Sequence, residues 1–336
     1  MAPQHKADWD AGFLLDISVV ICIYAENRWD DFLLAIDSVQ QQSISPREII
    51  VIVDYNPGLL ERVRAHLTGV VVAENSELRG LSGARNSGIR AAGGAVVAFL
   101  DDDAVAAPRW LEELQAGYQD PAVIGVGGAI KPRWVDGRPP WFPEEFNWVV
   151  GCTYRGVPST ATHVRNFLGC NMSFRQEVFR AIGRFRNGMG RVGTRPLGCE
   201  ETELCIRAVQ YRPNSVLLYK PSAKVYHRVP ANRVHWSYYL SRCYSEGLSK
   251  AQVARFVGAK DGLASERVYT CKTLPRGAVR GLKNTIVNHD PAGLKRTGAI
   301  IAGLALTISG YLVGTVSERS TTIQRWLMRR AEVSGN

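Results

Sequence analysis

The amino-acid sequence predicts an α/β fold with a mixed, mostly parallel sheet flanked by helices, followed by a helical C-terminal extension. Two observations support this prediction. Between residues 16 and 100, short β-branched runs alternate with segments of helical periodicity, which is typical of parallel strands joined by right-handed crossovers. After residue 236 the pattern is helical throughout, first aromatic, then basic, and finally without charge over residues 297–317.

The elements of the first half follow from their periodicity. Strands buried on both faces form continuous apolar runs, whereas amphipathic helices repeat apolar residues three and four positions apart. Strands are predicted at residues 17–24, 48–53, 70–73 and 95–100, and helices at 30–42, 59–67 and 82–92.

The second half has a different composition. Residues 131–143 are rich in Pro, Trp and Arg and predict a loop over a site. Beyond it we expect a strand and a turn over 164–174, a helix at 200–209, strands at 216–219 and 223–226, and a helix at 236–256.

Composition limits the classes of partner. The 336 residues carry a net charge of +10, which suits a polyanion such as a nucleotide diphosphate, an anionic lipid surface or nucleic acid. No pattern of an RNA- or DNA-binding module is present, so nucleic acid is not expected. The seven cysteines include no CxxC pair, which predicts reduced thiols in the cytoplasm and not a disulfide framework. The charged N-terminal tail, residues 1–15, predicts no secretory signal.

The C-terminal region predicts contact with a membrane. Residues 271–296 hold six basic residues against one acid, and residues 297–317 form an apolar helix without charge. Its length suffices to cross a bilayer, although it contains four glycines. It is a membrane span, a helix lying in the interface, or a buried core helix. The basic segment favours association with anionic lipid at the cytoplasmic face.

Asp101, Asp102 and Asp103 give the strongest chemical signal. They directly follow a buried strand, where three carboxylates are costly unless a cation neutralises them. Mg²⁺ or Mn²⁺ binds one or two protein carboxylates and completes its shell with phosphate oxygens and water. Ligands of parallel sheets also bind at the carboxyl ends of the strands. The alternative is a solvated turn with capping acids before Pro108.

A glycine-containing segment supports a phosphate ligand. Residues 80–88, Gly-Leu-Ser-Gly-Ala-Arg-Asn-Ser-Gly, place a turn before a helix, and a helix N-terminus favours phosphate. Arg85 would add charge-assisted hydrogen bonds to a diphosphate. The segment matches neither the P-loop nor the GxGxxG pattern. The alternative is a helix that happens to carry arginines.

In this order, the motifs resemble the large inverting glycosyltransferase family 2, which has the GT-A fold. The resemblance covers residues 17–227 and rests on six motifs, at residues 23–28, 54, 85–88, 101–103, 169–173 and 199–204. It implies metal-dependent transfer of a sugar from a UDP- or dTDP-sugar, with Mn²⁺ or Mg²⁺ as cofactor. The implied acceptor is lipid-linked or a polysaccharide of the cell envelope, at the cytoplasmic face of the membrane.

The resemblance also implies roles for residues that contact the donor. Tyr24, Glu26 and Asp54 would line the nucleobase and ribose, and Arg85 would lie near the diphosphate. Asn171 would face the pocket for the sugar and the acceptor.

The metal site is implied in the same way. Asp101 and Asp103 match the two acids of the family's DxD element, with Asp103 as direct metal ligand and Asp102 facing the ribose or the outer shell. His227 would complete the metal site, although a buried core histidine is the alternative. Arg228 and Arg233 would steady the departing diphosphate.

An inverting transfer needs a carboxylate that takes the proton of the acceptor hydroxyl. The family usually provides it from a Glu-Asp pair that opens a helix, and here the pair is Glu200-Glu201, with a longer second side chain. We expect Glu201 to be the base, with Glu200 as the alternative and Glu203 on the other helix face. An acidic helix N-terminus that favours the helix dipole is the other interpretation.

The predicted organisation is an N-terminal tail at 1–15, a GT-A catalytic domain at 16–235 and a helical extension at 236–336. Residues 131–167 would shape the acceptor pocket. The helix carrying Tyr238, Arg242 and Lys250 would face a lipid acceptor or the bilayer, or simply pack. Two other functions stay open: a nucleotidyltransferase of similar fold, and a non-catalytic member that binds nucleotide-sugar. The oligomeric state is not predicted.

Overall fold

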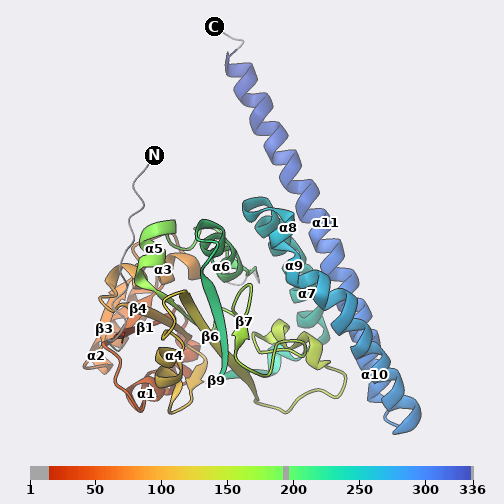
Figure 1. Cartoon of the computed structure of the whole chain (residues 1–336), viewed down its shortest axis with the longest axis horizontal. Helices are drawn as coiled ribbons and strands as arrows, with labels where there is room; N and C mark the ends of the chain where they lie inside the picture. The colour runs from red at the N-terminus through yellow and green to blue at the C-terminus, as the bar shows by residue number, and fades with distance from the viewer. Residues whose placement is uncertain (1–14, 192–196, 334–336) are drawn as a thin grey trace.

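The computed structural model describes residues 15–191 and 197–333, with side chains described as far as residue 317. A nine-stranded mixed sheet with helices on both faces forms the larger part of the molecule, and long C-terminal helices lie along one side of it (Figure 1). The predicted N-terminal tail lies almost wholly outside the described residues.

The first half is built as predicted. Four strands pair in parallel in the order β3-β2-β1-β4, and the helices between them cover both faces of the sheet. The strands are β1 (Ile17–Ile23), β2 (Glu48–Val53), β3 (Val71–Glu74) and β4 (Val96–Asp101). The helices are η1 (Glu26–Arg28), α1 (Trp29–Gln40), α2 (Pro57–His66) and α3 (Leu81–Ala91).

Alternate side chains of β1 point into two cores. Val19 and Ile21 pack in the core below α1, while Val20 packs in the core below α3. Helix α3 approaches β1 closely, since a Cβ on Gly88 would lie 2.4 Å from Val20 Cγ1. This close packing is the structural reason for glycine at the end of the Arg85–Gly88 motif.

The second half extends the sheet with strands of mixed direction. β8 pairs antiparallel with β4 and β6, and β9 pairs in parallel with β6. The strands are β5 (Ala104–Ala106), β6 (Val123–Trp134), β7 (Thr162–His163), β8 (Asn171–Arg175) and β9 (Val216–Val229). The remaining helices of this half are α4 (Trp110–Ala116), η2 (Glu144–Val150), α5 (Gln176–Ile182), α6 (Glu200–Tyr211) and η3 (Ala231–Arg233).

Three predictions for this half are wrong. Only residues 171–175 of the expected strand at 164–174 are a strand, because the preceding residues line a cavity. The expected strands at 216–219 and 223–226 are one strand, β9, with an irregular register against β6. β6 was not predicted, and its last residues lie in the segment expected to be a loop. Its glycines hid the pattern, and Gly128 permits a close approach, since a Cβ there would lie 1.6 Å from the carbonyl oxygen of Ala223.

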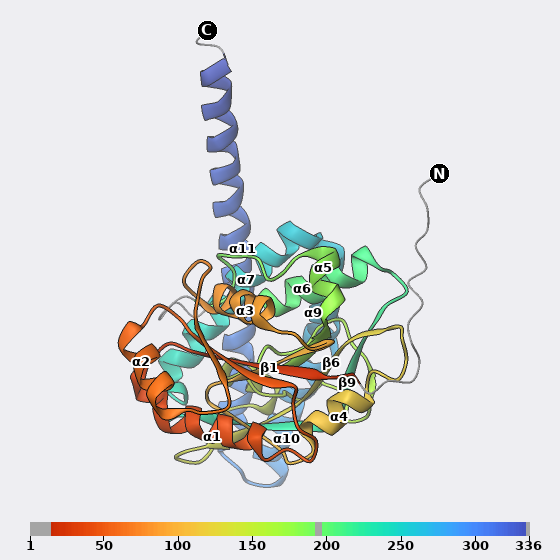
Figure 2. The same ribbon diagram turned by 90° about the vertical axis from the view of Figure 1, so that its left-hand side faces the viewer.

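The C-terminal helices pack on one another and against the sheet domain. They are α7 (Trp236–Val257), α8 (Ala259–Gly262), α9 (Ala264–Val268), η4 (Tyr269–Thr273), α10 (Leu274–Val287) and α11 (Ala292–Val333). The C-terminal part of α11 extends well beyond the sheet domain (Figure 1; Figure 2 shows the same from the side).

Glycines set the contact between α11 and α7. A Cβ on Gly310 would lie 2.1 Å from the carbonyl oxygen of Tyr244, and one on Gly247 would lie 2.1 Å from that of Thr307. The glycines that made the membrane-span interpretation marginal therefore allow two helices to approach closely. By length and composition, Ala292–Ser317 qualifies as a membrane span, and 28% of its most apolar window is buried.

Candidate active site

A cavity of about 450 Å³ opens at the carboxyl ends of β1, β2 and β4. Its size lies in the range of sites that bind small molecules. Strand ends form one side of it, and α6, α7 and α11 contribute to the other. Most of the predicted site residues line it: Tyr24, Asp54, Arg85, Asp101, Asp102, Asp103, Glu200, Glu201 and His227.

Asp102 and Asp103 are buried among cations. Arg28, from η1, forms ion pairs with both carboxylates, at 3.3 Å from Asp103 Oδ2. Arg233 Nη2 lies 3.4 Å from the same oxygen. The pairing of β5 with β9 sets Ala104 opposite His227, which brings His227 Nε2 to 3.1 Å from Asp103 Oδ1.

These contacts shift the pKa values of the two carboxylates in opposite directions. Burial raises the pKa of Asp103, but His227, Arg233 and Arg28 outweigh burial and hold that pKa well below its usual value. Burial and the neighbouring carboxylates raise the pKa of Asp102 to about 7, against the opposing effect of Arg28. Burial lowers the pKa of His227, yet the ion pair with Asp103 raises it to about 10. Asp103 is therefore charged at neutral pH, as a metal ligand must be. His227, by contrast, is protonated at neutral pH and would lose that proton on binding a metal ion.

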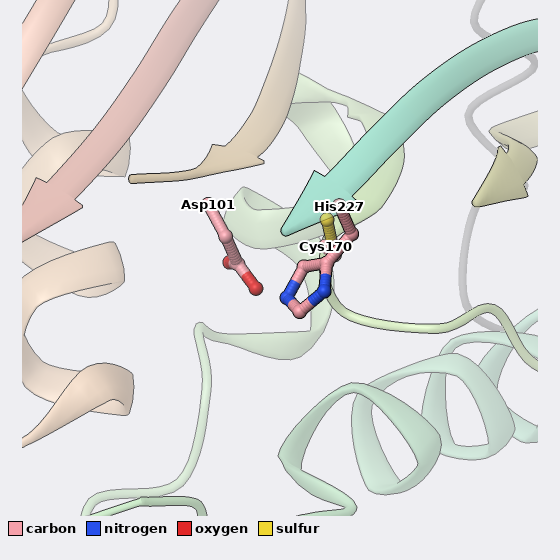
Figure 3. Close-up of side chains that lie close together, drawn as sticks. All are labelled: Asp101, Cys170 and His227. Carbon is pink, nitrogen blue, oxygen red and sulfur yellow. The ribbon is translucent and has the colours of Figure 1, made fainter. Parts of the chain in front are cut away.

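The residues predicted to hold a metal lie together. Asp101 and His227 point toward one another across the end of the sheet, with Cys170 beside the imidazole (Figure 3). One ligand atom from each of these three lies within 4.8 Å of the others. Asp102 Oδ2 is buried and has no hydrogen-bond partner among the residues that the structure describes. Carboxylate oxygens suit Mn²⁺ or Mg²⁺, an imidazole suits Mn²⁺ less well, and the thiol of Cys170, which was not predicted, favours softer metals.

Arg85 links three of the sequence motifs. It is buried, and its guanidinium donates to Glu200 Oε1 at 2.8 Å, to Asp101 Oδ1 at 3.1 Å and to the Gly169 carbonyl at 2.9 Å. Its side chain thus fixes the end of β4 against the start of α6. Contact between Arg85 and a diphosphate stays a prediction.

A protein carboxylate lies at the start of α3, where a phosphate was expected. Asp54 accepts from the Gly80 N–H at 3.0 Å and from Asn75 Nδ2 at 2.6 Å. The Leu81 N–H donates to the Arg191 carbonyl at 3.0 Å. The segment at 80–88 therefore positions Asp54 at the cavity edge. Nearby, the Arg28 guanidinium lies 5.3 Å from the centre of the half-exposed Tyr24 ring.

Helix α6 presents its two glutamates differently. The preceding residue, Cys199, has a φ of 67°, an uncommon conformation outside glycine that turns the chain sharply into the helix. Both glutamates line the cavity, but Glu200 is paired with Arg85, whereas Glu201 accepts from Thr202 Oγ1 at 3.1 Å. Burial, and then the charge of Glu200, raise the pKa of Glu201 to about 7. Such a carboxylate is suited to accept a proton near neutral pH.

The other acid of this helix lies elsewhere, as expected. Glu203 is buried away from the cavity, at 2.6 Å from Arg186 Nε and 2.8 Å from Arg207 Nε. It stabilises the helix and its surroundings.

Three predicted residues lie outside the cavity. Glu26 is on the surface and pairs with Arg62 at 2.8 Å, because η1 turns its side chain outward. Arg228 pairs with Asp31 at 3.2 Å. Asn171 does not face the sugar pocket: its Nδ2 donates to the Ala129 and Ala223 carbonyls, and its Oδ1 accepts from the Trp110 indole. A buried amide needs such partners, so it serves the core.

One wall of the cavity is charged, and two of its cations, Arg242 and Lys250, belong to the helix that was expected to face a lipid acceptor or the bilayer, or simply to pack. The other charged residues of this wall were not predicted. Arg242 and Lys250 of α7 lie 3.4 Å from the Glu246 carboxylate between them, and Lys250 also lies 2.8 Å from Glu266 Oε1. Arg165 donates to the same Glu266 at 2.9 Å. The spacing of four residues between the α7 charges was a readable signal. The pairing of Arg28 with the Asp triplet was not predicted either.

Comparison with known proteins agrees with this geometry. Residues 18–183 match the model of glycosyl transferase family 2. The chain is 32% identical over 308 residues, 90% of its length, to the glucosyl-dolichyl phosphate glucuronosyltransferase of Haloferax volcanii, and the match covers 97% of that protein. It is 21% identical over 276 residues to the succinoglycan biosynthesis protein ExoM of Rhizobium meliloti, which is 76% of this chain and 85% of that protein.

Two solved structures share the fold. The mannosyltransferase PcManGT from Pyrobaculum calidifontis, in complex with GDP-Man and Mn²⁺, matches with a TM-score of 0.53 and 16% identity, over 90% of this chain and 91% of that one. GalNAc-T7 with UDP, GalNAc and Mn²⁺ matches with a TM-score of 0.51 and 19% identity, over 83% of this chain and 58% of that one. The fold predicted from the sequence is confirmed.

Proposed function

Because this chain belongs to glycosyl transferase family 2 and is a glycosyltransferase, we propose that it transfers a sugar, with inversion, from a nucleoside diphosphate sugar to a lipid-linked sugar phosphate. The single observation that carries the mechanism is the position of Glu201, which faces the cavity beside the acidic metal site. With the family established, the nucleotidyltransferase alternative is set aside.

The substrate class rests on the Haloferax relative. Its name describes transfer of a glucuronosyl group to glucosyl-dolichyl phosphate, and the two chains match over nearly their whole lengths. We therefore propose a polyisoprenyl-phosphate-linked sugar as acceptor and UDP-glucuronic acid as the first donor to test, among UDP- and dTDP-sugars. With a lipid acceptor, the reaction would take place at a membrane surface, and we propose that this is the cytoplasmic face.

The donor side of the cavity suits a nucleotide. Tyr24 and Asp54 would contact the base and ribose, and Arg233 would neutralise charge on the diphosphate. Asp101, Asp103 and His227 would hold Mn²⁺ or Mg²⁺, with Cys170 adjacent. When bound, the metal ion supplies positive charge that stabilises the leaving diphosphate.

Glu201 drives the transfer itself. It accepts the proton of the attacking acceptor hydroxyl, whose oxygen forms a bond to the anomeric carbon as the bond from that carbon to the diphosphate oxygen breaks. The bonding electrons leave with the diphosphate. Arg85 holds Glu200 by an ion pair, so Glu201 is left to face the acceptor.

A transfer assay tests this proposal. Wild type is supplied with a panel of UDP- and dTDP-sugars, Mn²⁺ or Mg²⁺, and a glucosylated polyprenyl phosphate, and the linkage of the product is determined by NMR. We expect one donor to be used, with inverted configuration, and Glu201→Gln to bind that donor without transferring it. Retention of configuration, or full transfer by Glu201→Gln, would rule out the proposed mechanism.

A further inference from the structure

Helix α11 has two faces of different kinds. One face packs on α7 and α10 through glycines and threonines, including Gly303, Gly310 and Thr297. The remaining surface of the helix carries exposed apolar side chains at intervals of four or seven residues, which we call the α11 stripe: Leu294, Ile301, Ile308, Leu312 and Val316. An apolar surface of this length indicates a binding partner.

The α11 stripe continues into the catalytic cavity. Ile308 is half exposed on the stripe and also lines the cavity, next to Leu304 and Tyr311. Two more apolar side chains of the C-terminal helices, Leu263 and Leu274, line the same cavity. An apolar path therefore leads from the outer surface of α11 into the catalytic cavity.

A charged zone separates this apolar end from Glu201. Helix α7 lies between α6 and α11: the Cys199 thiol donates to its Glu246 at 3.2 Å, and Gly310 packs against its Tyr244. Among the described residues, this part of the wall holds three cations and two carboxylates, an excess of one positive charge: Arg165, Arg242 and Lys250 against Glu246 and Glu266.

Three kinds of surface thus follow one another from Glu201 outward: a proton acceptor, a cationic zone and an apolar path. A sugar hydroxyl, a phosphate and a hydrocarbon chain follow one another in the same order in a lipid-linked sugar phosphate. We infer that the hydrocarbon chain of the acceptor lies against Leu304, Ile308 and Tyr311, and that α11 lies along the membrane surface and does not cross it. This inference rests on the proposed function and specifies its acceptor site.

The position of α11 at the cavity excludes a spanning arrangement. Residues 304–311 lie beside the ion pairs of α7, and charged groups in the hydrocarbon core are costly. Helix α10 also fits the interface, because exposed Val279, Leu282 and Ile286 lie on it together with Arg276 and Lys283. Exposed apolar residues with basic neighbours are typical of helices that lie in the headgroup region.

The first test needs no turnover. The full chain is mixed with a long-chain polyprenyl phosphate that carries a diazirine in its chain, irradiated without donor, and digested for mass spectrometry. We expect labelled peptides from residues 263–274 and 304–311. Labelling confined to other parts of the chain would overturn the inference, even if the enzyme transfers sugar to lipid. Labelling at the expected residues without transfer to any acceptor would instead contradict the proposed function.

A matched pair of variants separates the chain site from general membrane contact. Ile308→Ser changes a stripe residue that lines the cavity, whereas Ile301→Ser changes one that is 61% exposed, one heptad earlier and away from the cavity. For Ile308→Ser we expect about a tenfold higher KM for the long-chain acceptor, since burying one aliphatic side chain is worth roughly 1.5 kcal/mol. The KM for a short-chain soluble acceptor stays within about twofold in both variants.

Ile301→Ser serves as the control for membrane contact. It reduces binding to vesicles containing anionic lipid as much as Ile308→Ser does, but it leaves the KM for the long-chain acceptor in detergent micelles unchanged. Circular dichroism verifies that both variants keep the helical content of wild type. Equal KM changes in the two variants would mean that α11 only contacts the membrane and holds no acceptor chain.

Discussion

The two sides of the cavity are built from different material. On the strand side, Asp54, Asp101 and His227 extend from a hydrogen-bonded sheet, where register fixes their positions. On the helix side, Glu201, Lys250 and Ile308 come from three helices that are distant in sequence and meet only through packing. Donor chemistry, as we propose it, lies on the rigid side, and acceptor recognition lies on the side that packing alone assembles.

The largest effect is expected on the strand side. Asp103→Asn removes the charge that His227, Arg233 and Arg28 stabilise, so we expect activity to fall on the order of 10⁴-fold and Mn²⁺ affinity to fall with it. Turnover and Mn²⁺ binding by electron paramagnetic resonance provide the two measurements.

Asp31→Asn is the matched control for this prediction. Asp31 pairs with Arg228 and does not line the cavity, so its variant should keep activity within about threefold of wild type. Equal losses in the two variants would show that folding, and not the metal site, accounts for the effect of Asp103.

The second-largest effect is expected on the helix side of the cavity, at Glu201. Glu201→Gln should lower kcat about 10³-fold with little change in donor KM, because the general base is lost while the donor site is intact. In wild type, kcat/KM should rise with pH up to about 7 and then level off, because Glu201 must be deprotonated to act.

Asp102 is the other group with a pKa of about 7 and provides the comparison. If Glu201 causes the rise of kcat/KM with pH, the Asp102→Asn variant should still show this rise. The residual activity of Glu201→Gln should then be independent of pH in the same range. If the rise of kcat/KM with pH disappears in Asp102→Asn instead, Asp102 and not Glu201 is the group whose titration limits activity.

The sequence predicted the strand side far better than the helix side. Strands β1 to β4 follow from continuous apolar runs, and carboxyl ends of parallel strands meet at one edge, so Asp54 and the Asp triplet could be placed together. The prediction for Asn171 was wrong because the local sequence of a polar residue after a turn is the same whether its side chain faces a pocket or the core. Only packing decided that it bonds to Ala129, Ala223 and Trp110.

The helix side could not be assembled from the sequence for a physical reason. The charged residues of α7 repeat at intervals of four, which the sequence shows. The local sequence does not show that Arg165 and Glu266, which are distant in the chain, form ion pairs in the same cluster. Likewise, the glycines in α11 counted against a membrane span, but the sequence did not show that they allow α11 to lie close to α7. Local sequence patterns do not predict contacts between helices that are distant in the chain, whereas they do predict where buried strands end.

A smaller effect tests the missed residue of the strand side. Arg28 binds both Asp102 and Asp103, so Arg28→Gln should raise the donor KM by about 10- to 100-fold, as expected for loss of a hydrogen bond to a charged group. Arg47→Gln is the control, because Arg47 is exposed and pairs with Asp16 at the opposite ends of the strands. An unchanged donor KM in Arg28→Gln would leave Arg28 only a structural role.

The smallest effect concerns the packing that holds the helix side together. A Cβ on Gly310 would lie 2.1 Å from the Tyr244 carbonyl oxygen, so Gly310→Ala must push α11 away from α7, at about 1–3 kcal/mol of unfolding free energy. Gly298 lies on the same helix with no atom within 4 Å of an added Cβ, and Gly298→Ala should stabilise the helix by up to about 1 kcal/mol. Urea denaturation measures both, and destabilisation by Gly298→Ala would contradict the packing. Because α11 contributes Ile308 to the cavity, Gly310→Ala should also weaken diazirine labelling of residues 304–311, while Mn²⁺ binding on the strand side stays unchanged.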